Sequence, residues 1–514
     1  MSWKFSPQVR QQLFPRQVAV EEAQGAVTDR AYVDFVRQFR QSELVALVAA
    51  VAPRYSFNQA DYTTDSLVTP WGLADVARVS LTFGSERNRL TPTRADLDRC
   101  LLMHNDLGHP GLKEQESGAL AGVFLQLAFS QFSFQRDVGT FTGRSIALFD
   151  QTEPADPTRM KVLHGDWQTK LLGCSLTEYI GVTQLMMAAA QPNNGRFDPA
   201  WIEREELKDL TDIFDPAVTR HVLREHLVAP ASNFRRHADQ VPGVGRRFTF
   251  NPLLKTPVVS GLGPDLLVPI PDYVSWKPTP NGLFYDGIEK WGEPFAQDLG
   301  LLFEAYVGRQ LNLITGGGAA VHPEIVYRRQ KQEKKSIDWF VVFPHLVLLV
   351  EVKARRANEA LRTGSPEGAA VAMQRAFNHA NTQLGTTFDM IKNRAPEFAD
   401  IPADRPVIGM VVTIEDFHVA NSALHLPMYS PSTKLPTLVV AADELEGIVG
   451  LGAATEGFLL EQASATPGRY ANLRQALSEH EIPANPILAA GVASSPINRV
   501  KDITEDRDDA VERR

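Results

Sequence analysis

The chain has 514 residues, more than one hydrophobic core normally holds, so we expect roughly two to four domains. Hydrophobic residues make up 44% and charged residues 22%, a globular composition that excludes collagen-like and disordered chains. The formal charge of −9 argues against a general coat for polyanions, so any nucleic-acid contact must come from local basic patches. Cys100 and Cys174 exclude a disulfide scaffold and indicate a reducing, cytoplasmic setting in which both are buried. With no export signal and no membrane-spanning run in the sequence, we expect no membrane contact.

Residues 1–246 are expected to form a large, mainly α-helical N-terminal domain that serves recognition or partner binding. Residues 32–52 and 171–190 carry apolar side chains at three- and four-residue spacing, which is typical of amphipathic helices. Residues 144–149 are a candidate short strand. Nine Pro and Gly residues between positions 229 and 267 predict an irregular linker, and we place a domain boundary between residues 246 and 247.

Residues 247–450 are expected to form an α/β domain. Apolar periodicity predicts helices at 294–314 and 366–393. β-branched and aromatic runs predict buried strands, with 324–327 as the first of them. The other predicted strands are 337–343, 346–353, 407–413 and 437–440. This order favours a mixed sheet flanked by helices. Residues 451–514 are expected to be a helical extension whose charged tail, 499–514, is disordered.

Three ionisable residues are predicted to converge on one face of that sheet. If the strands around Pro344-His345 form an antiparallel hairpin, Asp338 lies directly opposite Glu351, with Cβ atoms roughly 4.5–5.5 Å apart. Lys353 lies two residues further on and shares the same face. A structural alternative is an Asp338–Lys353 ion pair with Glu351 solvated at the strand end.

Two neighbouring buried carboxylates repel each other unless a cation neutralises them. Oxygen-only ligands suit Mg²⁺ or Mn²⁺. The ammonium of Lys353 could orient an attacking water or offset charge that builds on a phosphoryl group. These residues therefore predict metal-dependent hydrolysis of phosphodiester bonds.

Asp338, followed after twelve residues by Glu351-Val352-Lys353 at the end of an apolar strand, resembles the PD-(D/E)XK nuclease superfamily. The resemblance extends over about residues 294–440 and implies a restriction-endonuclease-like fold. It implies that Asp338 and Glu351 bind the metal and that Lys353 assists the nucleophile. Ile337 stands where the superfamily's name has Pro, a position that varies among relatives.

The resemblance also implies site residues on the two predicted helices. Many members carry a metal-site Glu on the first helix, which corresponds to Glu304 here, and Gly300 and Gly308 are expected to leave open room beside it. Many members also place a Gln on the helix after the strands, and both Gln374 and Gln383 match. The structural alternative is that these side chains are ordinary surface positions of helices.

Two basic patches stand out in the acidic chain. Residues 328–362 hold nine basic and four acidic side chains, and residues 219–247 hold six arginines and two acids. Such patches suit phosphate contacts, which position a nucleic acid without identifying its bases. The alternative for the second patch is a solvated loop. The predicted nucleic-acid contacts are Arg328, Arg329, Lys331, Lys334, Lys335, Arg355 and Arg356.

The sequence thus predicts a Mg²⁺-dependent nuclease that acts on DNA. A role in restriction-like defence follows from the superfamily by analogy, and a protein partner of the N-terminal domain or a homo-oligomer is also compatible with it. Two alternatives stay open: a non-cleaving nuclease-fold scaffold that binds nucleic acid or protein, and a nuclease that cleaves RNA.

Overall fold

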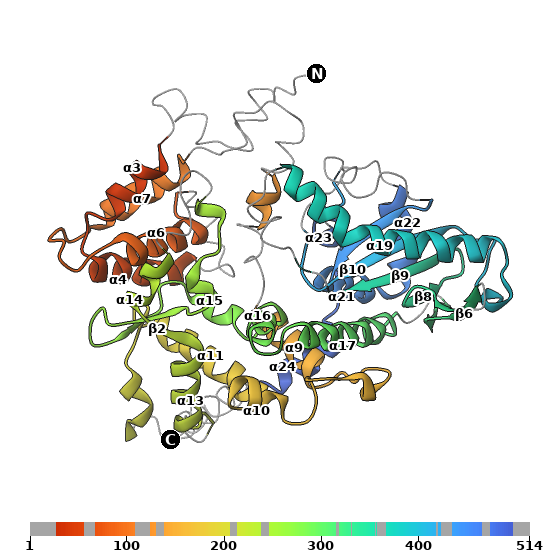
Figure 1. The fold of residues 1–514 in the computed structure, drawn as a ribbon, viewed down its shortest axis with the longest axis horizontal. Coiled ribbons are helices and arrows are strands. Elements are labelled where there is room, and N and C mark those ends of the chain that lie inside the picture. Colours follow the sequence, from red (N-terminus) through yellow and green to blue (C-terminus); the bar gives the residue numbers. More distant parts are fainter. Residues whose placement is uncertain are drawn as a thin grey trace, which may run out of the picture.

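The computed structural model describes residues 27–55, 67–107, 124–129, 138–205, 213–237, 246–314, 318–329, 332–354, 356, 366–417, 420–422, 434–464 and 473–496. Figure 1 shows N-terminal helices on one side of the molecule and a sheet with its covering helices on the other. The structure therefore combines a helix-rich region with an α/β region, as expected from the sequence. In the described part of the chain, no helix is both long and apolar enough to cross a membrane.

A core built mainly by helices forms the N-terminal unit. Its helices are α3 (Asp29–Val36), α4 (Gln41–Val51), α6 (Pro70–Phe83) and α7 (Arg94–Asn105). Residues 32–52 are therefore two helices rather than the single one predicted. The backbone between α3 and α4 leaves the helical hydrogen-bond pattern, because the Arg40 amide donates to the Leu90 carbonyl at 2.8 Å. Cys100 is buried within this core, as predicted.

One helix prediction and one strand prediction in this half also need correction. Residues 171–190 form α10 (Trp167–Leu172) and α11 (Leu176–Ala190), because Gly173 adopts φ 75° and a Cβ there would meet the His221 ring at 1.9 Å. Ser175 then caps α11. The candidate strand at 144–149 is the end of helix α9 (Val138–Phe149).

The Pro- and Gly-rich stretch is not a linker, because its short strands pair in a four-stranded sheet. The sheet has the order β1-β4-β3-β2, with β2 and β3 parallel and the other pairs antiparallel. Its strands are β1 (Arg196–Phe197), β2 (Val228–Pro230), β3 (Val258–Ser260) and β4 (Leu266–Leu267). The sheet joins residues on both sides of the predicted boundary at residue 246, and the N-terminal core continues to Tyr273.

A five-stranded mixed sheet forms the centre of the second unit, with the order β11-β10-β9-β8-β5. Strands β9, β10 and β11 are parallel, whereas β8 and β5 are antiparallel to their neighbours. The strands are β5 (Ala320–Pro323), β8 (Trp339–Val342), β9 (Val347–Lys353), β10 (Val407–Thr413) and β11 (Thr437–Ala441). The mixed sheet was predicted, but its first strand was placed wrongly, at residues 324–327. Part of that segment instead belongs to β6 (Val326–Arg329), which pairs with β7 (Gln332–Lys335) in a separate two-stranded sheet.

Helices cover both faces of this sheet. Side chains of β9 alternate between them: Leu348 and Val350 pack in the core that contains α17 (Glu293–Leu311), and Val347 and Leu349 pack in the core that contains α19 (Pro366–Lys392). Both helices were predicted. The remaining C-terminal helices are α21 (Ala442–Gly450), α22 (Thr455–Ser464), α23 (Leu473–Leu477) and α24 (Pro486–Ala493). Helix α24 packs against α9 from the N-terminal half, and the predicted disordered tail lies outside the described residues.

Candidate functional site

The register of the β8–β9 hairpin places Asp338 next to Glu351. Trp339 pairs with Val350 at the end of β8, so the next position on each strand is Asp338 and Glu351, as predicted. Asp338 lies one residue before the strand, in a bend. Its Oδ2 accepts a hydrogen bond from the Val352 amide at 2.7 Å. The carboxylate therefore replaces the backbone partner that β9 loses where β8 ends.

Glu351 is a buried acid with one unpaired oxygen. Only 1% of its surface is exposed, which contradicts the alternative of a solvated strand end. Its Oε1 accepts a hydrogen bond from Lys353 Nζ, so the ion pair is Glu351–Lys353 rather than Asp338–Lys353. Its Oε2 is buried and has no hydrogen-bond partner among the described residues. A buried carboxylate oxygen without a partner is costly, and a proton or a bound cation would relieve that cost.

Lys353 selects one of the two candidate glutamines. Its Nζ donates to Gln383 Oε1 at 3.3 Å, and Gln383 is half-buried on α19. Gln374 lies on the same helix but is exposed, as the surface alternative expects. The ammonium of Lys353 is thus held between a carboxylate and an amide oxygen, with 20% of the side chain still accessible.

Glu304 approaches this group from α17. It is half-buried, and the Trp339 indole N–H donates to its backbone carbonyl at 3.1 Å, which fixes the helix against β8. The expectation of open room beside it is correct at Gly300 but wrong at Gly308. A Cβ on Gly308 would meet the Trp339 ring at 2.1 Å, so this glycine makes space for the indole.

The carboxylates raise one another's pKa. Burial, then the charge of Asp338, raises the pKa of Glu351 to about 8, although Lys353 opposes this. Burial, then Asp338, also raises the pKa of Glu304 to about 7. Burial raises the pKa of Asp338 to about 6, against the Val352 amide and Lys353. Burial is the largest cause in each case, so this site disfavours charged carboxylates unless a cation neutralises them.

Sequence reasoning missed two charged residues near the site. Glu324 raises the pKa of both Glu304 and Asp338, and it forms an ion pair with Lys335 at 2.7 Å. Arg159 lowers the pKa of Glu304 from a distant part of the chain. Neither residue lies in a motif. Glu324 could have been found only from the position of the β5–β8 pairing, and Arg159 had no sequence signal.

The predicted basic contacts separate into three groups. Arg328, Lys334 and Lys335 are exposed on the β6–β7 hairpin, where they can meet a phosphate backbone. Arg356 is a correction, because it is half-buried and its guanidinium donates to backbone carbonyls of α16 (Pro280–Trp291). The side chains of three further predicted contacts lie outside the described residues: Arg329, Lys331 and Arg355.

The second basic patch also needs correction. Arg246 is 4% exposed and forms ion pairs with Asp29 and Asp75 inside the N-terminal unit. Arg247 is half-buried and donates to the His104 carbonyl at 3.3 Å. These two guanidinium groups hold the fold together, so the patch is weaker at the surface than its sequence suggests.

The residues at the end of β9 fit a hard divalent cation. Among the described residues, no three His, Cys, Asp or Glu side chains lie close enough together to hold a metal as they stand. The donors are nevertheless of the right kind, because they are carboxylate oxygens, and one of them, Glu351 Oε2, lacks any other partner. Asp338, Glu351 and Glu304 are the side chains that would hold Mg²⁺ or Mn²⁺.

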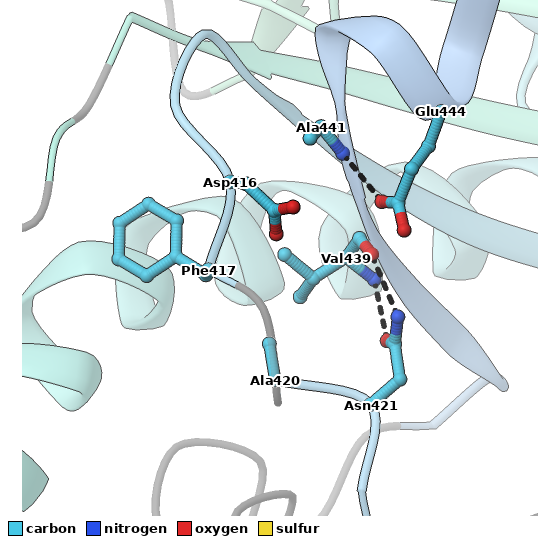
Figure 2. A pocket seen from close by; sticks show the side chains of 7 residues that line it. All are labelled: Asp416, Phe417, Ala420, Asn421, Val439, Ala441 and Glu444. Carbon is cyan, nitrogen blue, oxygen red and sulfur yellow. Dashed lines mark hydrogen bonds between the residues drawn. The ribbon is translucent and has the colours of Figure 1, made fainter. Parts of the chain in front are cut away.

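An acidic pocket lies at the ends of β10, the strand next to β9, and β11 (Figure 2). Glu444 accepts hydrogen bonds from the Ala441 amide at 2.9 Å and the Leu473 amide at 2.8 Å. Asp416 forms an ion pair with Arg474 at 2.6 Å. Sequence reasoning missed this pocket. Its carboxylates already have partners within the protein, so they serve to fix α21 and α23.

Comparisons with known proteins leave this geometry without a relative. No family model, no curated protein and no solved structure matches the chain.

Proposed function

We propose that this protein is a Mg²⁺-dependent nuclease that hydrolyses phosphodiester bonds, with DNA as its substrate. The observation that carries the proposal is the unpaired, buried Glu351 Oε2 beside Lys353 at the end of a central strand. A buried acid in this position is destabilising unless it binds something, and a divalent cation is the simplest ligand for it.

Each residue has a role that follows from its contacts. Glu351 and Asp338 would hold the cation, and Glu304 would complete the site from α17. Mg²⁺ bound there would polarise a phosphoryl oxygen and lower the pKa of a water ligand. The side chain of Lys353 is 20% accessible, and its Nζ can donate a hydrogen bond to an attacking water or a phosphate oxygen. Gln383 keeps that ammonium in place.

A non-cleaving scaffold is the second candidate, and one observation favours it. Lys353 already pairs with Glu351, which is how a purely structural ion pair behaves. A scaffold of this kind would bind nucleic acid through the exposed β6–β7 hairpin without hydrolysing it.

Cleavage assays on matched variants distinguish the candidates. Linear, circular and single-stranded DNA, and RNA, are incubated with wild-type protein, Lys353→Ala or Lys255→Ala in Mg²⁺, Mn²⁺ or EDTA. Lys255 is an exposed lysine whose partner is Glu289, so it controls for the loss of a surface charge. We expect wild type and Lys255→Ala to cleave DNA only with metal, and Lys353→Ala to cleave at least about a hundredfold more slowly.

The other outcomes are equally informative. Faster cleavage of RNA than of DNA would show that RNA, rather than DNA, is the substrate. No cleavage of any substrate, together with a melting temperature that metal leaves unchanged, would overturn the nuclease proposal and favour the scaffold.

A further inference from the structure

Three aromatic side chains form a cluster on two neighbouring helices. Trp276 ends α15 (Pro271–Trp276), and Phe284 and Tyr285 lie on α16 (Pro280–Trp291). The ring of Tyr285 lies 5.9 Å from that of Trp276 at 32°, and 5.8 Å from that of Phe284 at 85°. Tyr285 keeps 41% of its surface exposed, while Trp276 and Phe284 are half-buried. Aromatic surface is therefore accessible at this cluster.

Arg356 connects this aromatic cluster to the end of β9. Its guanidinium donates to the Pro280 carbonyl at 2.7 Å and to the Asn281 carbonyl at 3.0 Å, and it lies 3.9 Å from the centre of the Phe284 ring. These contacts place the start of α16 beside Arg356, three residues after the end of β9. In Figure 1 the arrowhead of β9 points toward the middle of the molecule, where α16 lies.

The separation between Lys353 and Arg356 suits a nucleotide a few steps along the strand from the cleaved phosphate. Lys353 and Arg356 are three residues apart, so at most about 10 Å of extended chain separates them. That length corresponds to about three base steps along a strand at 3.4 Å per step. A base that follows the cleaved phosphate can therefore reach the aromatic cluster.

We infer that the cluster of Trp276, Phe284 and Tyr285 stacks an unpaired nucleobase of the substrate strand a few nucleotides from the cleaved phosphodiester. The inference rests on the proposed nuclease function and narrows its substrate to strands with a single-stranded or flipped-out base. Every base has a π face, so aromatic platforms bind single strands with little sequence preference. A base within a duplex is covered on both faces and cannot use the platform.

Binding measurements on matched variants test this inference. Tyr285→Leu keeps apolar bulk without a ring, and Tyr285→Phe keeps the ring without the hydroxyl. Phe250→Leu removes an aromatic side chain of similar exposure, 49%, that lies outside the cluster. Affinity for labelled single-stranded DNA and RNA, for the same strands with abasic positions, and for duplex DNA is measured by fluorescence anisotropy in EDTA, which prevents cleavage.

We expect Tyr285→Leu to weaken the binding of intact single strands about tenfold and to leave the binding of duplex and abasic strands unchanged. Tyr285→Phe and Phe250→Leu should bind like wild type. Equal affinities of wild type and Tyr285→Leu would overturn the inference, as would equal binding of intact and abasic strands or no binding of single strands by wild type. An equal loss in Phe250→Leu would do the same, because the effect would then be general.

The two proposals can fail separately. Metal-dependent cleavage by wild type with unchanged affinity in Tyr285→Leu would remove only the stacking inference. A selective loss of single-strand binding in Tyr285→Leu, with no cleavage in any metal, would remove only the nuclease proposal.

Discussion

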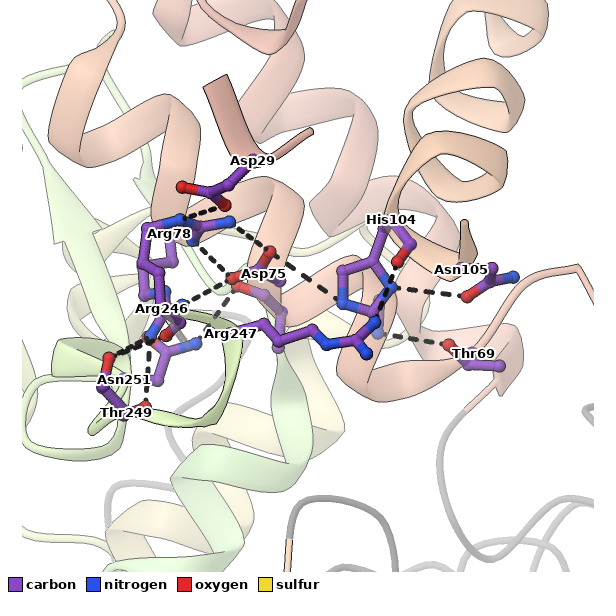
Figure 3. A network of polar contacts seen from close by, with 12 residues as sticks. Asp29, Thr69, Asp75, Arg78, His104, Asn105, Arg246, Arg247, Thr249 and Asn251 are labelled. Carbon is purple, nitrogen blue, oxygen red and sulfur yellow. Dashed lines mark hydrogen bonds and ion pairs between the residues drawn. The ribbon is translucent and has the colours of Figure 1, made fainter. Parts of the chain in front are cut away.

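Two regions of this protein bury carboxylates, and they balance the charge in opposite ways. In the N-terminal unit, Asp75 is 4% exposed and receives a bidentate pair of hydrogen bonds from Arg246, at 2.9 and 3.1 Å. Arg78 adds an ion pair at 2.8 Å (Figure 3). Cations outnumber acids there. At the end of β9, Glu351 has one lysine partner, Lys353, while the charges of Asp338 and Glu304 oppose its own.

The pKa values record that difference. Burial alone would raise the pKa of Asp75, but Arg246 and Arg78 outweigh it and hold the pKa far below its ordinary value. For Glu351 burial prevails, and the pKa rises to about 8. A buried carboxylate with its own guanidinium partners has a structural role. A buried carboxylate whose charge the protein's own cations do not balance requires a bound cation or a proton to neutralise it.

Removal of the charge of Asp75 should have the largest effect on stability. Asp75→Asn leaves Arg78 buried without its anion and Arg246 with Asp29 alone, so we expect the free energy of unfolding to fall by about 3–5 kcal/mol in chemical denaturation. Asp98→Asn, which breaks the partly exposed Arg94–Asp98 pair, is the control and should cost less than about 1 kcal/mol. Similar costs for both variants would contradict the structural role of Asp75.

Removal of the charge of Glu351 should affect stability far less and in the other direction. Glu351→Gln keeps the shape and removes an unfavourable buried charge, so at pH 8 in EDTA we expect a melting temperature equal to or above that of wild type. Mg²⁺ should raise the melting temperature of wild type by more than that of the variant, which keeps only Asp338 and Glu304 as carboxylate ligands. A strong loss of stability in EDTA would show that Glu351 is structural.

The contrast also explains what could be predicted from the sequence. Asp338, Glu351 and Lys353 lie on two adjacent apolar strands joined by a short turn, so strand period and turn position were enough to bring them together. Gln383 could not be separated from Gln374, because the choice depends on how α19 packs over β9. The same limit applied to Glu324.

The errors lie mainly where distant segments meet. Arg246 belongs to a sequence rich in Pro, Gly and Arg, and only its contacts with α3 and α6 show that it is internal. Very short strands such as β1 and β4 carry too few residues for a periodic signal, so their sheet was mistaken for a linker. Local periodicity identified the α/β region because its strands are longer and continuously apolar.

The two regions should respond oppositely to pH in the absence of metal. The folded-state pKa of Glu351, about 8, lies above its ordinary value of 4.5, so its stabilising effect is complete below 4.5 and disappears as the pH rises to about 8. The depressed pKa of Asp75 has the reverse effect, and its stabilisation is lost only in acid.

Hydrogen exchange by mass spectrometry, corrected for the intrinsic rate, locates these changes. In EDTA, β9 should lose protection between pH 6 and about 8.5, whereas α6 should keep it; Glu351→Gln should remove the change in β9. Equal pH dependence in both segments would contradict the local assignment.

The smallest expected effect separates the two glutamines of α19. Gln383→Leu removes the 3.3 Å contact with Lys353 Nζ, so we expect cleavage to slow about tenfold, the amount that corresponds to one hydrogen bond to a charged group. Gln374→Leu changes an exposed side chain on the same helix and should leave the rate unchanged. The pH profile of cleavage shows whether Gln383 acts through Lys353. Loss of the hydrogen bond to the Lys353 ammonium should shift the profile in Gln383→Leu and not in Gln374→Leu. Equal rates in the two variants would leave Glu351 as the sole partner that positions Lys353.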